Sequence, residues 1–171
     1  LVGESDTTPV RTTDNLEAYE LYLRGRFHLY QRVGGSFQNA LGCFERAVTL
    51  DPDYAQAHAG MAETCAMLGF YGIRHPNEVM PKAKEEAMRA LALDETLCAN
   101  HALAWVKLLH EWDWAGAKLE FQRALELEPG NAVIRSQHAL FILQMLEGRH
   151  EQAIAEGRLA LESDPLSSYP K

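Results

Sequence analysis

The chain has 171 residues, of which 47% are hydrophobic and 23% are charged, and its formal net charge is −8. These are ordinary values for one globular domain, so disorder is excluded as a description of the whole chain. An acidic chain without a cluster of Lys and Arg is poorly suited to neutralise phosphates, and we expect no nucleic-acid binding by these residues.

The first 14 residues are predicted to form a linker or N-terminal extension, residues 1–14. Their opening stretch, LVGESDTTPV, lacks the apolar segment of a signal peptide. No later apolar run approaches the roughly 20 residues that cross a bilayer. We therefore expect a cytoplasmic location and no membrane contact by these residues.

From residue 15 onward, two helical patterns alternate along the chain. The first pattern is rich in aromatic and aliphatic residues, and we call it helix A. It occurs as NLEAYELYLRGRFHLYQ, YAQAHAGMAETCAMLG, LCANHALAWVKLLH and NAVIRSQHALFILQML. The second pattern follows each copy of the first, and we call it helix B. It occurs as ALGCFERAVTLDPDYA, AKEEAMRALALDETLC, AKLEFQRALELEPGNA and AIAEGRLALESDPLSS.

Each helix-B segment fits A-x3-[F/A/G]-x2-A-x4-[P/E]. Residues three, four and seven apart share one face of an α-helix. Small alanines on that face let a neighbouring helix approach, and proline disfavours helix in the residue before it. The four sets with this structural role are Ala40, Phe44, Ala47, Pro52; Ala83, Ala87, Ala90, Glu95; Ala117, Phe121, Ala124, Pro129; and Ala153, Gly157, Ala160, Pro165.

The ends of these segments, at positions 52, 95, 129 and 165, are separated by 43, 34 and 36 residues. A helix-turn-helix unit of about 34 residues is the tetratricopeptide period. On these residues the chain resembles the tetratricopeptide repeat (TPR) family. The resemblance implies an all-α fold, a right-handed α-α superhelix of four repeats at about 16–52, 54–95, 97–129 and 132–165. These repeats form a TPR domain over residues 15–171, with the start of a further helix at 166–171.

Helix A matches the family pattern more loosely. Its Leu-Gly slot holds Gly25 in the first repeat, Met61-Ala62 in the second and His138-Ala139 in the fourth. Leu103-Ala104 fit in the third repeat, and a shift by one residue is an open alternative. Two insertions lengthen the turns from helix A to helix B. QRVGGSFQ adds a few residues in the first repeat, and GFYGIRHPNEVMP (69–81) is expected to form a long loop in the second.

Four stretches narrow the resemblance further: NLEAYELYLRGRFH, AHAGMAE, EWDWAGA and GRHEQAIAE. They are similar to TPR arrays at the C-terminal end of bacterial multidomain signalling proteins. In that family the partner domains are nucleotidyl cyclase, winged-helix regulator or kinase modules. The chain lacks a starting Met and stops in DPLSSYPK, so we interpret it as a fragment of a longer bacterial protein.

In the TPR family helix A lines a concave surface that binds partners. The resemblance implies that the lining consists here of Tyr19, Tyr22, Arg26, Tyr30, Gln56, Glu63, Met67, His101, Trp105 and Leu109. The Lys/Asn carboxylate clamp of chaperone-binding TPR domains is missing at the matching sites. For Tyr19 and Tyr22, contact between the helices of the first repeat is an equal alternative.

These features predict a non-catalytic module that binds a protein or peptide partner, in cis or in trans. The alternative function is a structural spacer or a self-association element, which would make a homodimer. A weaker alternative is a metal or small-ligand sensor that uses His58, His101 and His138 on successive copies of helix A.

The EWDWAGA stretch forms the turn from helix A to helix B in the third repeat. Asp113 is predicted to cap helix B through its carboxylate. Trp112 and Trp114 flank this cap and are predicted to pack the turn onto neighbouring helices, with ligand stacking as the alternative.

Motifs for catalysis or cofactor binding are missing from the sequence. It contains no HExxH, no zinc-type Cys/His spacing, no G-x-S-x-G elbow and no phosphate-binding Gly-rich loop with Lys. Cys43, Cys65 and Cys98 form no CxxC pair, and we interpret them as buried apolar thiols. We predict no catalytic residues, no cofactor and no metal.

Overall fold

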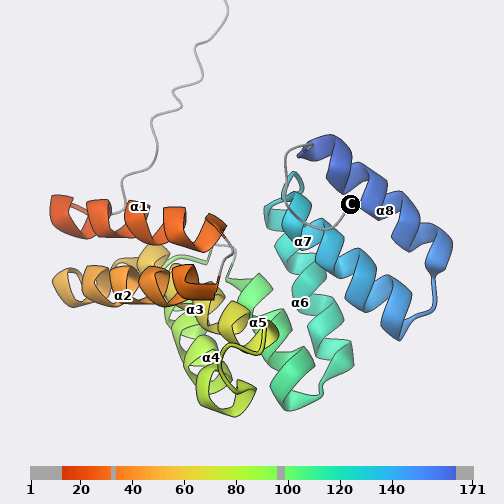
Figure 1. Cartoon of the computed structure of the whole chain (residues 1–171), viewed down its shortest axis with the longest axis horizontal. Coiled ribbons are helices and arrows are strands. Elements are labelled where there is room, and N and C mark those ends of the chain that lie inside the picture. The colour runs from red at the N-terminus through yellow and green to blue at the C-terminus, as the bar shows by residue number, and fades with distance from the viewer. Residues whose placement is uncertain (1–12, 32–33, 96–98, 165–171) are drawn as a thin grey trace, which may run out of the picture.

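The computed structural model describes residues 13–31, 34–95 and 99–164, and these residues form helices without any strand. The all-α superhelix predicted from the repeats is confirmed. Successive helix pairs stack from α1 and α2 at one end to α7 and α8 at the other (Figure 1). In chain order the described elements are α1 (Leu16–Gln31), α2 (Gly34–Leu50), α3 (Ala55–Phe70), α4 (Pro76–Leu93), α5 (Asn100–Val106), the π-helical η1 (Lys107–Glu111), α6 (Trp114–Leu127), α7 (Ala132–Gln137), the π-helical η2 (His138–Leu146) and α8 (His150–Ser163).

The face of each helix B that carries the alanines of the repeat motif packs against the neighbouring helices. Its members in α2, α4 and α6 are completely buried, and Ala153 and Ala160 of α8 are nearly so. α2 and α6 end shortly before Pro52 and Pro129, which are exposed. Pro165 lies outside the described residues. The fully buried members are Ala40, Phe44, Ala47, Ala83, Ala87, Ala90, Ala117, Phe121 and Ala124.

Two helices approach each other closely around the ring of Phe44. A Cβ atom placed on Gly25 of α1 would lie 2.6 Å from Phe44 Cε1. A Cβ placed on Gly60 of α3 would lie 2.6 Å from the same atom. One edge of the ring is therefore wedged between two helices that can come this close only because both contact residues are glycine.

The insertion at 69–81 forms a short turn and not the long loop that we expected. α3 continues to Phe70, Gly72 adopts φ +65° in the turn, and α4 begins at Pro76. The ring Nδ1 of His75 accepts a hydrogen bond from the Asn77 N–H at 3.2 Å, and proline suits the first turn of a helix. The remaining inserted residues lengthen α4, where Val79 and Met80 are buried.

Helix A of each of the last two repeats ends in a π-helical segment, η1 and η2. The Trp112 N–H donates to the Lys107 carbonyl, and the Glu147 N–H donates to the Ile142 carbonyl, five residues back in each case. A π turn holds an additional residue and so shifts which residues face inward. In the third repeat, Ala104 is fully buried whereas Leu103 is half-buried. This difference favours the alignment of Leu103-Ala104 with the Leu-Gly slot over the alignment shifted by one residue.

Within the described ranges, no helix is both long and apolar enough to cross a bilayer. The thiol of Cys65 is buried, and this burial raises its pKa to about 11, so the reactive thiolate is disfavoured. Cys43 is half-buried. Cys98 lies outside the described residues.

Candidate functional site

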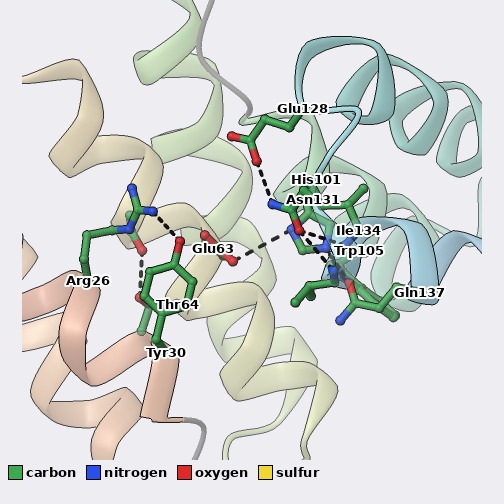
Figure 2. Close-up of polar contacts among 12 residues, drawn as sticks. Arg26, Tyr30, Glu63, Thr64, His101, Trp105, Glu128, Asn131, Ile134 and Gln137 are labelled. Atoms are coloured by element: carbon green, nitrogen blue, oxygen red, sulfur yellow. Dashed lines mark hydrogen bonds and ion pairs between the residues drawn. The ribbon is translucent and has the colours of Figure 1, made fainter. Parts of the chain in front are cut away.

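Four copies of helix A surround a cavity of about 100 Å³ on the concave side of the array. One wall comes from α1 and α3, and the other from α5 and α7 with the turn that precedes α7 (Figure 2). Both polar and apolar side chains line it, which suits a ligand with both kinds of surface. The lining residues are Tyr22, Arg26, Tyr30, Gln56, Ala59, Gly60, Glu63, His101, Glu128, Asn131, Val133 and Ile134.

Arg26 carries the positive charge of the cavity. Its Nη1 donates to the Tyr22 hydroxyl at 2.7 Å, and its Nη2 donates to the Tyr30 hydroxyl, one helical turn away on either side. Its guanidinium carbon lies 5.7 Å and 5.1 Å from the two ring centroids, close enough for cation–π attraction. Both partners are neutral, and within the described ranges no carboxylate forms an ion pair with Arg26.

Tyr22 is positioned by the core as well as by Arg26. Its ring lies 6.0 Å from the ring of Phe44 and 5.3 Å from that of Tyr54, measured between centroids. Burial raises the pKa of its hydroxyl, which therefore stays protonated and able to accept from Arg26. The tyrosine thus serves both as an inter-helix contact and as a lining residue.

The opposite wall contains a buried polar cluster around His101. Its Nε2 lies 2.5 Å from the Gln137 side-chain oxygen and 3.1 Å from the indole nitrogen of Trp105. The indole N–H of Trp105 also donates to this oxygen, at 3.2 Å. The other ring nitrogen of His101, Nδ1, lies 3.9 Å from Glu63 across the cavity. His101 therefore connects α5 to α7 and faces α3 (Figure 2).

Six of the residues predicted for the concave surface meet at this cavity, namely Tyr22, Arg26, Tyr30, Gln56, Glu63 and His101. Tyr19 is half-buried and packs against a small cluster that includes Ala18, Leu21 and Tyr54. Leu109 is half-buried against the main core.

Trp105 and Met67 lie in the core, at 0% and 1% exposure, which corrects their predicted place in the lining. Trp105 is enclosed by aromatic rings, with centroids 4.4 Å away for Phe70, 5.0 Å for Phe141 and 5.6 Å for Phe121. Aromatic pairs at these separations are favourable, so the indole is held by the fold and presents no surface to a partner.

Sequence reasoning missed the residues that come from the turn between α6 and α7. Asn131 caps α7, because its side-chain oxygen accepts from the N–H groups of Val133 and Ile134 at 3.1 Å and 3.2 Å. Its amide donates to Glu128 at 2.6 Å. The signal was present in the sequence as EPGNAV, since Asn before an apolar run is a typical helix cap. Its place beside the cavity depends on the curvature of the array.

The tryptophans of the EWDWAGA turn are exposed, at 71% for Trp112 and 54% for Trp114. This corrects the packing role predicted for them. Asp113 does cap α6 as predicted, and its carboxylate accepts from the Gly116 N–H at 2.9 Å. Trp112 ends the π segment with φ +57°, in the left-handed region, and this backbone turn directs its side chain outward.

The three histidines proposed for a sensor are held separately by the fold. His58 pairs with Glu86 at 2.6 Å, and this hydrogen bond raises its pKa. His101 belongs to the cavity wall. His138 is buried, its two ring nitrogens have no hydrogen-bond partner in the described structure, and burial lowers its pKa. Among the described residues, no group of three His, Cys, Asp or Glu side chains is placed to hold a metal ion.

No protein-family model matches the chain. It is 27% identical over 161 residues to the transcriptional regulator HilA of Salmonella typhimurium, and equally to HilA of Salmonella typhi. The aligned part is 94% of this chain and 29% of the regulator, so the chain spans less than a third of the relatives it matches.

Among solved structures, the chain resembles TTC0263, a thermophilic TPR protein of Thermus thermophilus. The TM-score is 0.67 at 22% sequence identity, and the match covers 88% of this chain and 76% of that one. Together with the stacked helix pairs, this similarity shows that the chain has the fold of a tetratricopeptide-repeat superhelix.

Proposed function

We propose that this chain is a non-catalytic module that binds a peptide or partner domain on its concave helix-A face, in cis or in trans. The observation that carries this proposal is the cavity lined by residues from four copies of helix A. A scaffold of stacked helix pairs offers such a continuous concave surface and has no need of chemistry of its own.

The chemistry of the cavity favours a partner segment that supplies a hydrogen-bond acceptor or a carboxylate. Arg26 is paired only with neutral hydroxyl groups, and its Nε is buried without a hydrogen-bond partner in the described structure. Charge-assisted hydrogen bonds are about twice as strong as neutral ones. On the other walls, Glu63 supplies a hydrogen-bond acceptor. Asn131 supplies a side-chain amide, which is held in place by its hydrogen bond to Glu128.

The second part of the proposal concerns the larger protein. A relative that is a transcriptional regulator and much longer than this chain supports a place within a bacterial regulatory protein. In such a protein the module would receive a signal as a bound segment. The favoured location is cytoplasmic. Self-association is a second candidate role, favoured by exposed apolar residues at the two ends of the array.

The test selects random peptides that bind the purified chain and measures their affinity by titration calorimetry for wild type and Arg26→Met. Methionine preserves the length of the side chain and removes the charge. Loss of a charge-assisted hydrogen bond is worth about 1.5–3 kcal/mol. We therefore expect binding to weaken by roughly tenfold or more.

The matched control is Arg89→Met on α4, because Arg89 is exposed, pairs with Asp53 and does not line the cavity. Selected peptides should bind this variant as they bind wild type. Peptides that bind Arg26→Met and wild type equally well would contradict a concave-face site, as would a selection that yields no binders.

A further inference from the structure

A second groove lies within the array, at the joint between the third and fourth repeats. Its volume is about 340 Å³, and α6, η2 and the first half of α8 form its walls. It shares no lining residue with the concave cavity. Among the residues that line it are Lys118, Gln122, His138, Leu143, Arg149 and Gln152.

His138 supplies this groove with a buried polar side chain that has no partner. The residue is 8% exposed, and within the described ranges neither of its ring nitrogens makes a hydrogen bond. The ring packs against the core, with its centroid 6.2 Å from that of Phe121. Burial lowers its pKa, so at neutral pH the ring is uncharged and offers one N–H donor and one acceptor. Because unsatisfied buried polar groups are costly, the ring favours a ligand that brings a polar atom within reach.

The groove also carries an excess of positive charge, although the whole chain has a net charge of −8. Lys118 of α6 and Arg149, which precedes α8, both pair with Glu147. One carboxylate therefore serves two cations, and each cation keeps further N–H donors. Glu156, the acidic residue in the lining, is occupied by Arg135, whose Nη1 lies 2.5 Å from its carboxylate. In these ion pairs the cations outnumber the carboxylates by one, which suits an anionic ligand.

We infer that this groove binds a small hydroxy acid, a carboxylate with at least one hydroxyl group on a short carbon chain. The carboxylate of the ligand bridges the remaining donors of Lys118 and Arg149, and a hydroxyl group reaches the ring of His138. A hydroxyl group both donates and accepts, so it fits the neutral ring in either tautomer. The amides of Gln122 and Gln152 are exposed along the groove and can bind further hydroxyl groups.

Other classes of ligand fit the groove less well. A simple carboxylate leaves His138 without a partner, and a neutral sugar leaves the excess positive charge uncompensated. A metal ion is not favoured, because among the described residues no three His, Cys, Asp or Glu side chains are grouped to hold one. A ligand in the groove contacts three helices at once and so should stabilise the stacking of the last two repeats. The inference goes beyond the concave-face proposal and does not depend on it.

Titration calorimetry on the purified chain with three matched pairs of acids tests the inference. The pairs are lactate with propionate, malate with succinate, and gluconate with hexanoate. The members of a pair have the same number of carbons and carboxylates, and they differ only in their hydroxyl groups. At least one hydroxy acid should bind wild type roughly tenfold or more tightly than its hydroxyl-free match, as expected for one additional hydrogen bond to a buried group.

Two variants separate the roles of the charge and of the ring. Lys118→Met should weaken binding of the hydroxy acid by roughly tenfold or more, through loss of a charge-assisted hydrogen bond. His138→Met should bind the hydroxy acid no more tightly than wild type binds the hydroxyl-free match. The matched control is Lys82→Met, because the side chain of Lys82 is similarly exposed, pairs with Glu45 and does not line the groove. Circular dichroism melts establish that each variant is folded.

Nitrogen NMR of the imidazole rings gives a readout that needs no variant to bind. The ring resonances of His138, identified by their loss in His138→Met, should shift when the hydroxy acid is added to wild type, whereas those of His58 should not. Failure of all three hydroxy acids to bind, equal affinity within every pair, a preference that survives in His138→Met, or unshifted His138 resonances would overturn the inference. Peptide binding to the concave face is measured separately, so failure here leaves that proposal standing.

Discussion

The ring of Phe44 makes Gly60 a position where alanine, normally a better helix former, should destabilise the protein. Gly60 lies in the middle of α3, where Gly→Ala ordinarily stabilises by up to about 1 kcal/mol. A Cβ there would lie 2.6 Å from both Cε1 and Cζ of Phe44. Non-bonded carbon atoms prefer separations of about 3.5–4.0 Å, so the ring or the helix must move by about 1 Å.

The ring has no free direction in which to move. The same edge faces Gly25 of α1, where another Cβ would also be 2.6 Å away, and Phe44 is completely buried. Overpacking in such a site costs about 1–3 kcal/mol. When the propensity gain of up to about 1 kcal/mol is subtracted from a mid-range overpacking cost of about 2 kcal/mol, we expect Gly60→Ala to lower the free energy of unfolding by about 1 kcal/mol. For a domain of this size, this corresponds to a Tm lower by roughly 2–4 °C.

Thermal and urea unfolding followed by circular dichroism measure this effect. The matched control is Gly42→Ala in α2, where a Cβ would meet no atom within 4 Å and the substitution should be stabilising. Adding Phe44→Leu to Gly60→Ala should cost less than the sum of the single changes, because the two residues share one contact. If Gly60→Ala is as stable as wild type, or the two effects are additive, the proposed wedge of Phe44 between α1 and α3 is refuted.

Three other predictions concern the turn and the buried histidine. Trp112→Ala should leave the Tm nearly unchanged because its side chain is exposed, whereas Trp105→Ala should cost about 3–5 kcal/mol in the same unfolding assay. Asp113→Ala should cost about 1 kcal/mol through loss of the cap on α6, and retention of full stability would contradict that role. Burial lowers the pKa of His138, so the unfolded chain binds a proton more readily and stability should fall as pH decreases through about 6.5. His138→Met should remove that part of the pH dependence in urea titrations, and an unchanged slope would show that His138 does not cause it.

His58 should act in the opposite direction and must be separated from His138 in such titrations. Its hydrogen bond with Glu86 raises its pKa in the fold. The stabilisation is therefore fully present below its unfolded pKa of about 6.5 and is lost as pH rises through the folded pKa. The difference between wild type and His138→Met isolates the contribution of the buried ring, because His58 is common to both.

Much of the fold could be predicted from local spacing. The alanines of helix B recur three, four and seven residues apart, and this spacing alone places them on one face. The structure buries that face, as Ala83, Ala87 and Ala90 illustrate at 0% exposure. The capping role of Asp113 could likewise be predicted from the sequence, because a helix cap depends on a few consecutive residues.

The candidate site was predictable only in part. Periodicity correctly grouped Tyr22, Arg26 and Tyr30 on α1, which lie one turn apart. It could not exclude Trp105, because aromatic neighbours from three other elements decide that the indole is enclosed. It also could not bring Asn131 to the cavity, since that position depends on how far the array curves.

Outside the insertion at 69–81, the sequence by itself therefore determined which segments are helical, how they pair and which face of each helix B is buried, because these properties follow from contacts within one or two turns. Only the tertiary structure decided that Trp112 is exposed, that Trp105 is core and that the concave cavity has its present lining. Whether a side chain on a given face is covered depends on the size and crossing of the neighbouring helix. The size and crossing of the neighbouring helix depend on residues far away in the chain, such as Phe44, whose ring packs against both Gly25 and Gly60.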